Sequence, residues 1–182
     1  MILVTGSNGF IGSEIISYFS KKGYDTVGIN IDIRNKNALR PLFIGADFVI
    51  HAAGKVKKEI PNLEDYYTIN VLGTRNVCSL CIENGSKLIH LSSIASSDGA
   101  NKSIKFYVES KQESQKLVQN YCHLYGLKAC ILKLGVIYNE QNNTHRPGPR
   151  YPIEKLLEDI EKIINSSEFK NFQLIDYSSM RA

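Results

Sequence analysis

The sequence predicts an α/β fold in which helices cover both faces of a parallel β-sheet. Two observations lead to this prediction. Short apolar runs rich in β-branched residues, typical of strands buried on both faces, alternate with longer segments whose apolar residues recur at helical spacing. The first of these runs leads through a glycine-rich turn into a helix. With 182 residues the chain is long enough for one such domain and too short for two.

The N-terminal residues combine a strand, a tight turn and a helix. Residues 2–4 are apolar, glycines follow as Gly6, Gly9 and Gly12, and residues 13–22 have helical periodicity. Such a turn needs a positive φ, lets a pyrophosphate approach the backbone, and offers it the N–H groups of the helix N-terminus. The pattern predicts a dinucleotide-binding turn, although a glycine loop without a ligand would have the same spacing.

Residues 25–30 are expected to form the second strand. In dinucleotide-binding folds an acid about twenty residues after the glycines binds the ribose of the ligand. Asp32 lies twenty residues after Gly12, while Asn30 occupies the nearer candidate position. Asp32 is therefore either a ribose ligand or a solvated turn residue. The following residues, 34–45, have room for one short helix at most.

The third expected strand, residues 48–50, is followed by small side chains. Ala52, Ala53 and Gly54 come directly after it. An exit of small residues allows a flat ligand to lie against the backbone. We therefore expect this exit to contribute to the same ligand site as the glycine turn.

A long helical pattern and a fourth strand come next. The helical pattern covers residues 62–83 and is interrupted near residues 70–73. The strand covers residues 86–93 and ends on Ser92 and Ser93. Hydroxyls at the carboxyl end of a parallel strand face the ligand crevice, but they could equally cap the helix that follows.

Tyr107 and Lys111 lie one turn apart on the same face of an expected helix that runs to about residue 125. Only this tyrosine follows a strand ending in serines and begins a helix. It alone is therefore expected to face the reactive end of a ligand that lies along the strand edges. The spacing itself is weak evidence, because two other pairs share it and are expected at the surface: Tyr18/Lys22 and Tyr151/Lys155.

Composition argues against several other functions. The net charge is only +4, and the basic residues are scattered without interleaved aromatic residues, which gives little support for nucleic-acid binding. No apolar run is long enough to cross a membrane and the chain opens directly in a strand, so we expect a cytoplasmic protein. Cys78 and Cys81 lie within a helical pattern and lack a second pair, and the histidines lack ligand spacing. We expect buried thiols and no metal site.

Five motifs in order resemble the extended short-chain dehydrogenase/reductases, and among these the NAD-dependent epimerase/dehydratase family of sugar-nucleotide enzymes. The resemblance implies a Rossmann-type NAD(P)-binding domain at residues 1–138 and a remnant of the substrate-binding lobe at residues 139–182. The motifs are Thr5-Gly-x-x-Gly-x-x-Gly12, Asp47-Phe-Val-Ile-His-Ala-Ala53, Asn70-Val-x-Gly-Thr74, Ser92-Ser93 and Tyr107-x-x-x-Lys111.

The resemblance also implies catalytic roles for four residues. Tyr107 would take a proton from a sugar hydroxyl as a hydride passes to the nicotinamide, and Ser93 would hydrogen-bond the reacting oxygen. Lys111 would hold the nicotinamide ribose, and Asn70 would support a water-linked proton path. An ammonium about 4 Å from the phenol is sufficient to lower a tyrosine pKa from about 10 to about 7.

The implied cofactor is NAD or NADP, with NAD slightly favoured. Its implied contacts include Tyr107 and Lys111. The other implied contacts are the glycines of the turn, the first residues of the helix, the Asp-Ile pair and the small-residue exit: Gly6, Gly9, Phe10, Ile11, Gly12, Asp32, Ile33, Ala52, Ala53 and Gly54.

The sequence also departs from the family. A strand and helix that usually separate the second and fourth strands are missing, and little follows the expected amphipathic helix at residues 154–165 and a strand-like segment at 173–181. We therefore expect a Rossmann-type parallel sheet with helices on both faces, shortened between strands 2 and 4, with most of the substrate lobe missing.

Two hypotheses follow for function. The first is an NAD(P)-dependent epimerase/dehydratase or reductase that acts on a nucleotide sugar, with a homo-oligomer as one way to complete its pocket. The second is a truncated, catalytically inactive relative that binds NAD(P) or only keeps the fold. We favour the enzyme because all four catalytic positions are present.

Overall fold

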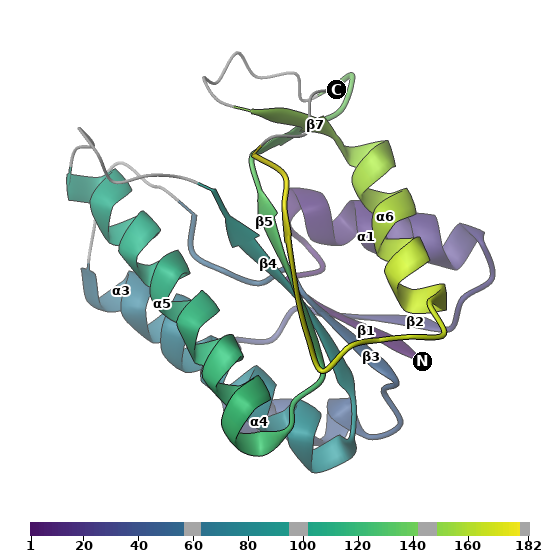
Figure 1. The fold of residues 1–182 in the computed structure, drawn as a ribbon, viewed down its shortest axis with the longest axis horizontal. Helices are drawn as coiled ribbons and strands as arrows, with labels where there is room; N and C mark the ends of the chain where they lie inside the picture. The colour runs from purple at the N-terminus through teal and green to yellow at the C-terminus, as the bar shows by residue number, and fades with distance from the viewer. Residues whose placement is uncertain (57–62, 95–101, 142–148, 179–182) are drawn as a thin grey trace.

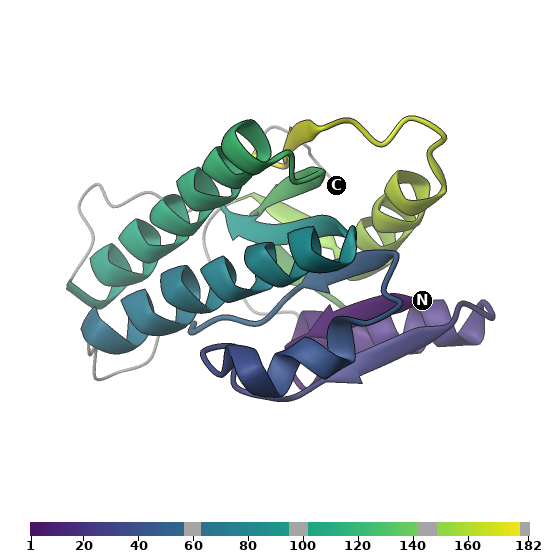
Figure 2. The ribbon, with the colours of Figure 1, turned by 90° about the horizontal axis from the view of Figure 1, so that it is seen from below.

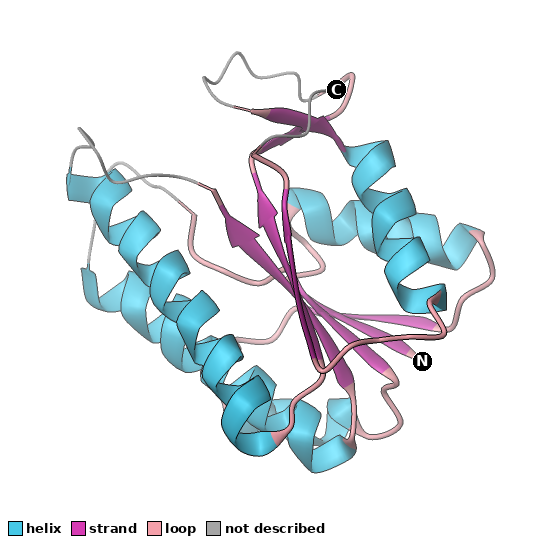
Figure 3. Ribbon diagram, in the orientation of Figure 1, coloured by secondary structure: helices cyan, strands magenta, loops and turns pink. Residues whose placement is uncertain are grey.

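The computed structural model describes residues 1–56, 63–94, 102–141 and 149–178. These residues form a six-stranded parallel sheet in the order β2-β1-β3-β4-β5-β8, with helices on both faces (Figures 1 and 3). The predicted fold class is confirmed. The six strands are β1 (Ile2–Thr5), β2 (Thr26–Ile29), β3 (Phe48–His51), β4 (Lys87–Ser93), β5 (Ala129–Leu134) and β8 (Phe172–Asp176).

The helices divide between the two faces of the sheet (Figures 1 and 2). α1 (Phe10–Lys21) and α6 (Ile153–Asn165) pack together on one face. The other face is covered by α3 (Leu63–Tyr67), α4 (Thr74–Asn84) and α5 (Lys102–Tyr125).

Each central strand contributes to both layers of the core. In β1, Ile2 and Val4 belong to the apolar cluster under α1 and α6, whereas Leu3 between them belongs to the cluster under α4 and α5. All three side chains are buried. This alternation follows from the two-residue period of a strand and explains why the strand sequences are continuously apolar.

The predicted shortening lies at the edge formed by β2. Among the described residues, β2 pairs only with β1, and the chain continues from it through residues 30–35 to two short helices. These are α2 (Lys36–Leu39) and the 3₁₀ helix η1 (Arg40–Phe43), which follows without a break. The expected single short helix is thus two consecutive ones, because Pro41 at the start of η1 ends regular α-helical hydrogen bonding.

The predicted interruption of the long helix is a π-helical segment. This segment, η2 (Thr68–Gly73), separates α3 from α4. At its end, a Cβ on Gly73 would lie 2.5 Å from the side chain of Ile33, so only glycine allows this close packing. Single π-turns within helices often occur at functional sites, and this one contains Asn70.

The segment after β5 adds a small sheet, a helix and the last strand of the main sheet. β6 (Val136–Tyr138) pairs with β7 (Arg150–Pro152), α6 follows, and β8 pairs in parallel with β5. The amphipathic helix expected at residues 154–165 is confirmed and begins one residue earlier. The domain boundary at residue 138 stays a prediction.

The expectation that Tyr151 lies at the surface is wrong. Its ring is buried and packs edge-on against Tyr177 with 4.7 Å between ring centroids, while its hydroxyl donates to Asp159 at 2.7 Å. The hydroxyl is satisfied inside the fold, so burying the ring brings apolar contact without leaving a polar atom unpaired. Lys155 is exposed, as expected, and so is Lys22, while Tyr18 is half-buried.

Candidate functional site

The glycine turn packs directly against the end of β3. Gly6 has a φ of +69°, and a Cβ at this position would lie 2.6 Å from the Cα of Ala53. A Cβ on Gly12 would overlap the carbonyl oxygen of Gly6, whereas the N–H of Gly9 donates to that carbonyl at 3.0 Å. Gly6 and Gly12 are therefore required by the close packing of the turn itself.

No side chain caps the N-terminus of α1. Its N-cap residue is Gly9, which makes no side-chain cap, and the first turn contains no acidic residue. The first N–H groups of a helix lack partners within the helix and carry the positive end of its dipole. Phe10 and Ile11, both half-buried, occupy this first turn. The arrangement suits a bound anion, such as a pyrophosphate.

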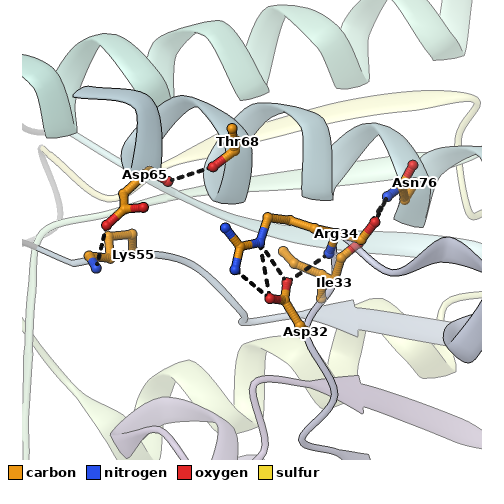
Figure 4. Close-up of polar contacts among 7 residues, drawn as sticks. All are labelled: Asp32, Ile33, Arg34, Lys55, Asp65, Thr68 and Asn76. Carbon is orange, nitrogen blue, oxygen red and sulfur yellow. Dashed lines mark hydrogen bonds and ion pairs between the residues drawn. The ribbon is translucent and has the colours of Figure 1, made fainter. Parts of the chain in front are cut away.

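Asp32 lies in an exposed loop after β2, where it forms an ion pair with Arg34 (Figure 4). The guanidinium contacts both carboxylate oxygens at 2.6–3.0 Å, and the backbone N–H of Arg34 adds a bond of 2.9 Å. These hydrogen bonds hold the pKa of Asp32 below its usual value. Both side chains are about half exposed, so the carboxylate remains accessible to a ligand.

The side chain of Ile33 points into the core and is 3% exposed. The expected contact of Ile33 with the cofactor stays a prediction. Asn76 donates to the carbonyls of both Ile33 and Arg34 at 3.0 Å and so fixes this loop against α4 (Figure 4).

Tyr107 and Ser93 meet at the carboxyl end of β4. A hydrogen bond with Ser93 lowers the pKa of Tyr107, but burial of the phenol is the larger effect, and the pKa is raised overall. The ring of Tyr66 lies edge-on to Tyr107 at 6.4 Å. Ser92 instead donates to Gln115 at 3.4 Å. The two serines that the sequence left undistinguished thus have different partners.

Lys111 is buried beneath this pair. Its ammonium donates to the carbonyl of Leu91 at 2.7 Å, and burial lowers its pKa to about 8. The pKa of Tyr107 is raised, and Ser93 and Tyr66 are the groups that act on it besides burial. The ammonium of Lys111 is directed to a backbone carbonyl, and its expected effect on the pKa of Tyr107 stays a prediction.

Asn70 ties two parts of the site together. Its Oδ1 accepts from the N–H of Lys55 at 2.7 Å, and its Nδ2 donates to the carbonyl of Lys55 at 3.1 Å and to Ser110 at 2.8 Å. Ser110 in turn donates to the carbonyl of Tyr107 at 2.8 Å. Asn70 therefore joins the segment after β3 to the helix that carries Tyr107.

Comparison with known proteins places this geometry in a family. The sequence model of the NAD dependent epimerase/dehydratase family matches residues 2–171. The chain belongs to this family. It is 26% identical over 165 residues to the N-acetyl-alpha-D-glucosaminyl-diphospho-ditrans,octacis-undecaprenol 4-epimerase of Escherichia coli O157:H7, covering 78% of this chain and 50% of that relative.

Solved structures share the fold of this epimerase/dehydratase family member. A UDP-N-acetylglucosamine 4-epimerase from Bacillus cereus superposes with a TM-score of 0.81 at 18% identity, covering 100% of this chain and 78% of that one. The UDP-glucose 4-epimerase of Thermus thermophilus in complex with NAD gives a TM-score of 0.78 at 19% identity, covering 97% of this chain and 77% of that one. The chain spans only 50–58% of the length of the first curated relatives it matches.

The described part of this family member also bears on the expectations about metal ions, cysteines and membrane spans. It holds no cluster of three or more His, Cys, Asp or Glu residues that could bind a metal ion. Its four cysteines are free and buried, as expected, and burial raises the pKa of their thiols. None of its described helices is both long and apolar enough to span a membrane.

Several residues of the site escaped prediction from the sequence. Lys55, which forms an ion pair with Asp65 at 3.3 Å, lies in no motif (Figure 4). Ser110 occupies an unspecified position of the Tyr107-x-x-x-Lys111 motif. Ser110 lies one residue before Lys111 and so shares its turn of α5. For Ser110, the only signal in the sequence was that a polar residue lies next to a candidate catalytic residue on the same helix.

Proposed function

We propose that this protein is a dinucleotide-dependent oxidoreductase of the sugar-nucleotide epimerase/dehydratase type, in which Tyr107 transfers the proton. The observation that supports this most is the pairing of Tyr107 with Ser93 at the carboxyl edge of the sheet. The glycine turn after β1 and the small-residue exit after β3 end at the same edge, which is where ligands bind in such folds.

The residues of the glycine turn fit a dinucleotide. The uncapped N-terminus of α1 offers N–H groups and a positive dipole to the two phosphates, and Gly9 leaves the approach free of a side chain. Around this turn the proposed contacts are Gly6, Phe10, Ile11, Gly12, Ala52, Ala53 and Gly54. The bound oxidised dinucleotide would supply the hydride acceptor.

NAD is proposed as the preferred cofactor over NADP. Asp32 remains ionised because its pKa is lowered, and about half of its side chain is exposed. A carboxylate near the adenosine ribose accepts hydrogen bonds from its hydroxyls and repels a 2′-phosphate. Arg34 offsets part of this charge, so the preference for NADH over NADPH should be modest. The ion pair gives Asp32 a fixed position in either case.

Tyr107 would act on a sugar hydroxyl. The phenolate is disfavoured in the ligand-free protein, and the positive charge of the oxidised dinucleotide would favour it. It would then take the hydroxyl proton while the C–H hydride passes to the dinucleotide, and it would return that proton when the hydride is returned. Ser93 would orient the reacting oxygen, and Lys111, whose ammonium donates to the carbonyl of Leu91 in the ligand-free protein, would hold the nicotinamide ribose. The named relatives act on sugar diphosphate compounds, and a nucleotide sugar is the substrate we propose here.

A charge inserted at the N-terminus of α1 tests the cofactor site. Ser13→Asp adds a negative charge one turn into the helix, where it opposes a pyrophosphate but does not oppose folding. We expect NADH, followed by its fluorescence, to bind the variant roughly three- to tenfold more weakly. Ser20→Asp makes the same change near the other end of α1 and should leave binding unchanged. Equal affinities in both variants would contradict the proposed phosphate site.

Turnover is tested with UDP-, GDP- and dTDP-sugars in the presence of NAD. Epimer formation or cofactor reduction that is lost in Tyr107→Phe would support the enzyme. Dinucleotide binding without turnover of any sugar would instead support an inactive relative that keeps the cofactor site. Sedimentation of the active species would show whether a second copy completes the substrate pocket.

A further inference from the structure

A buried histidine on β3 connects the glycine turn to the helix segment that contains Asn70. His51 is 1% exposed. Its Nδ1 lies 2.7 Å from the hydroxyl of Thr5, at the end of β1, and its Nε2 lies 3.0 Å from the hydroxyl of Thr74, at the start of α4. Both threonines are also buried.

The hydrogen-bond partners fix the direction of every bond in this series. The hydroxyl of Thr74 donates its proton to the carbonyl of Asn70 at 2.6 Å, so it can only accept from His51. His51 must then carry its proton on Nε2, and its Nδ1 accepts from the hydroxyl of Thr5. That hydroxyl accepts in turn from the N–H of Ala53 at 3.3 Å.

Further hydrogen bonds lead from Asn70 to α5, the helix that carries Tyr107. The side chain of Asn70 donates to Ser110, and Ser110 donates to the carbonyl of Tyr107. We call the five side chains Thr5, His51, Thr74, Asn70 and Ser110 the buried relay; each is at most 4% exposed. The bonds from the glycine turn end at the main-chain carbonyl of Asn70, and the side chain of the same residue begins the bonds to Tyr107, so Asn70 joins the two sets.

Because the relay is buried, losing one of its hydrogen bonds costs much free energy of folding. A buried polar group that loses its partner costs far more than the net gain of an ordinary hydrogen bond, and bonds in a series polarise one another. The neighbouring His90 differs in this respect, although its ring lies 5.3 Å from that of His51. Its Nε2 reaches only Ser114 on α5, at 3.3 Å, and that contact leads to the carbonyl of Lys111 rather than to the glycine turn.

We propose that His51 is a positioning residue, which holds the glycine turn in register with Asn70 and thereby fixes the place of Tyr107. The functional consequence rests on the proposed function, since it assumes a dinucleotide at the turn and proton transfer at Tyr107. The relay itself is a property of the protein without ligand. Because the two parts are separable, one series of variants tests both.

The central variant removes one hydroxyl and keeps the shape of the side chain. Thr74→Val takes away the group that accepts from His51 and donates to Asn70, whereas Thr74→Ser retains it. Thr26→Val is the matched control. The hydroxyl of Thr26, at the start of the edge strand β2, donates to the carbonyl of Tyr24 and lies outside the relay. Replacing His51 itself is less informative, since a variant of so buried a residue can fail to fold.

The ring nitrogens of His51 provide the first measurement. In a ¹H–¹⁵N correlation spectrum at pH 7, wild type and Thr74→Ser should show a neutral His51 with its proton on Nε2. Thr74→Val should change the signals of His51 and leave those of the exposed His123 unchanged. A proton on Nδ1 in the wild type would overturn the relay.

Amide hydrogen exchange provides the second measurement, again without ligand. In Thr74→Val we expect exchange at residues 107–111 to accelerate about tenfold more than exchange in α6, which the relay does not contact. Thr74→Ser and Thr26→Val should exchange as the wild type does. Equal acceleration of both helices would show a general loss of stability and would refute a specific positioning role.

Adding NADH then tests the functional consequence. In the wild type, protection should rise both at residues 6–12 and at residues 107–111, whereas in Thr74→Val it should rise only at residues 6–12. A rise at both segments in the variant would contradict the coupling. If the wild type binds no dinucleotide, the proposed function fails, while the ligand-free measurements still decide whether the relay exists.

Discussion

Two Tyr-x-x-x-Lys pairs on different helices have the same spacing but different chemistry. On α1, the ammonium of Lys22 is exposed and pairs with the carboxylate of Glu161, which raises the pKa of the lysine. On α5, the ammonium of Lys111 is buried and contacts a carbonyl, and burial lowers its pKa to about 8. The helix spacing is the same, and the surroundings decide the charge.

The tyrosines differ in a related way. Tyr18 donates its proton to Glu161 at 2.8 Å, so its hydroxyl is committed to a surface cluster that joins α1 to α6. Tyr107 shares its hydrogen bond with Ser93 at the carboxyl edge of the sheet. A phenol beside a carboxylate is discouraged from ionising, whereas one beside a hydroxyl can take part in proton transfer. Only the second pair is suited to the proposed reaction.

The largest expected difference between the two pairs concerns turnover. Tyr107→Phe should lower kcat for the sugar substrate by about 10²–10⁴-fold, because it removes the proposed proton acceptor. Tyr18→Phe should leave kcat unchanged. Steady-state rates with saturating NAD provide the measurement. Comparable rates in wild type and Tyr107→Phe would remove the basis for distinguishing the pairs.

The next largest difference concerns stability against pH. The pKa of Lys111 is about 8 in the folded protein and about 10.4 in the unfolded chain, so between these values the unfolded state binds more protons and stability rises with pH. The full rise is about 3 kcal/mol. The four buried thiols act in the opposite direction, because their raised pKa values make stability fall as the pH rises in this range. Guanidinium unfolding of ligand-free protein at pH 7–10 should therefore show the stability of wild type rising relative to that of Lys111→Met, since both proteins contain these thiols.

Lys22→Met serves as the control for that experiment. Its pKa is raised rather than lowered, so its charge favours the folded state at every pH below about 10.4 and gives no rise in this window. The same dependence of stability on pH in wild type and Lys111→Met would show that the pKa of Lys111 is not lowered in the folded protein.

The order of elements could be predicted from the sequence because local patterns determine it. The apolar run of β1, the glycines after it and the helical period of α1 each indicate one structure and agree with one another. Even the irregular π-helical segment left a trace, since Asn70 and Gly73 interrupt an otherwise regular helical pattern. The candidate residues Ser93 and Tyr107 were found through their order relative to these elements.

Distant contacts could not be predicted in this way. The partner of Lys111 is a carbonyl of β4, and burial lowers the pKa of the lysine; spacing along α5 indicated neither. The link from His51 to Thr5 joins two strands whose register appears only once the sheet is formed. Such contacts depend on tertiary packing rather than on local pattern.

A smaller effect is expected from the two serines at the end of β4. Ser93→Ala removes the bond that lowers the pKa of Tyr107, so the pKa should rise further and kcat/KM at pH 7 should fall about tenfold. The ascending limb of kcat/KM plotted against pH should move to higher pH in this variant. Ser92→Ala is the matched control, because Ser92 bonds to Gln115 instead. Equal profiles for the two variants would mean that neither serine acts on the phenol.

The smallest effect should follow from breaking the surface cluster of α1 and α6. Glu161→Gln removes the carboxylate that accepts from Tyr18, Lys22 and Tyr24. Exposed ion pairs contribute little, so the melting temperature should fall by no more than about 2–4 °C. The pKa of Tyr18 should then fall, because the same carboxylate now discourages its ionisation. Calorimetry and a spectroscopic phenol titration measure the two quantities, and an effect on turnover would show that the first pair is not separate from the site.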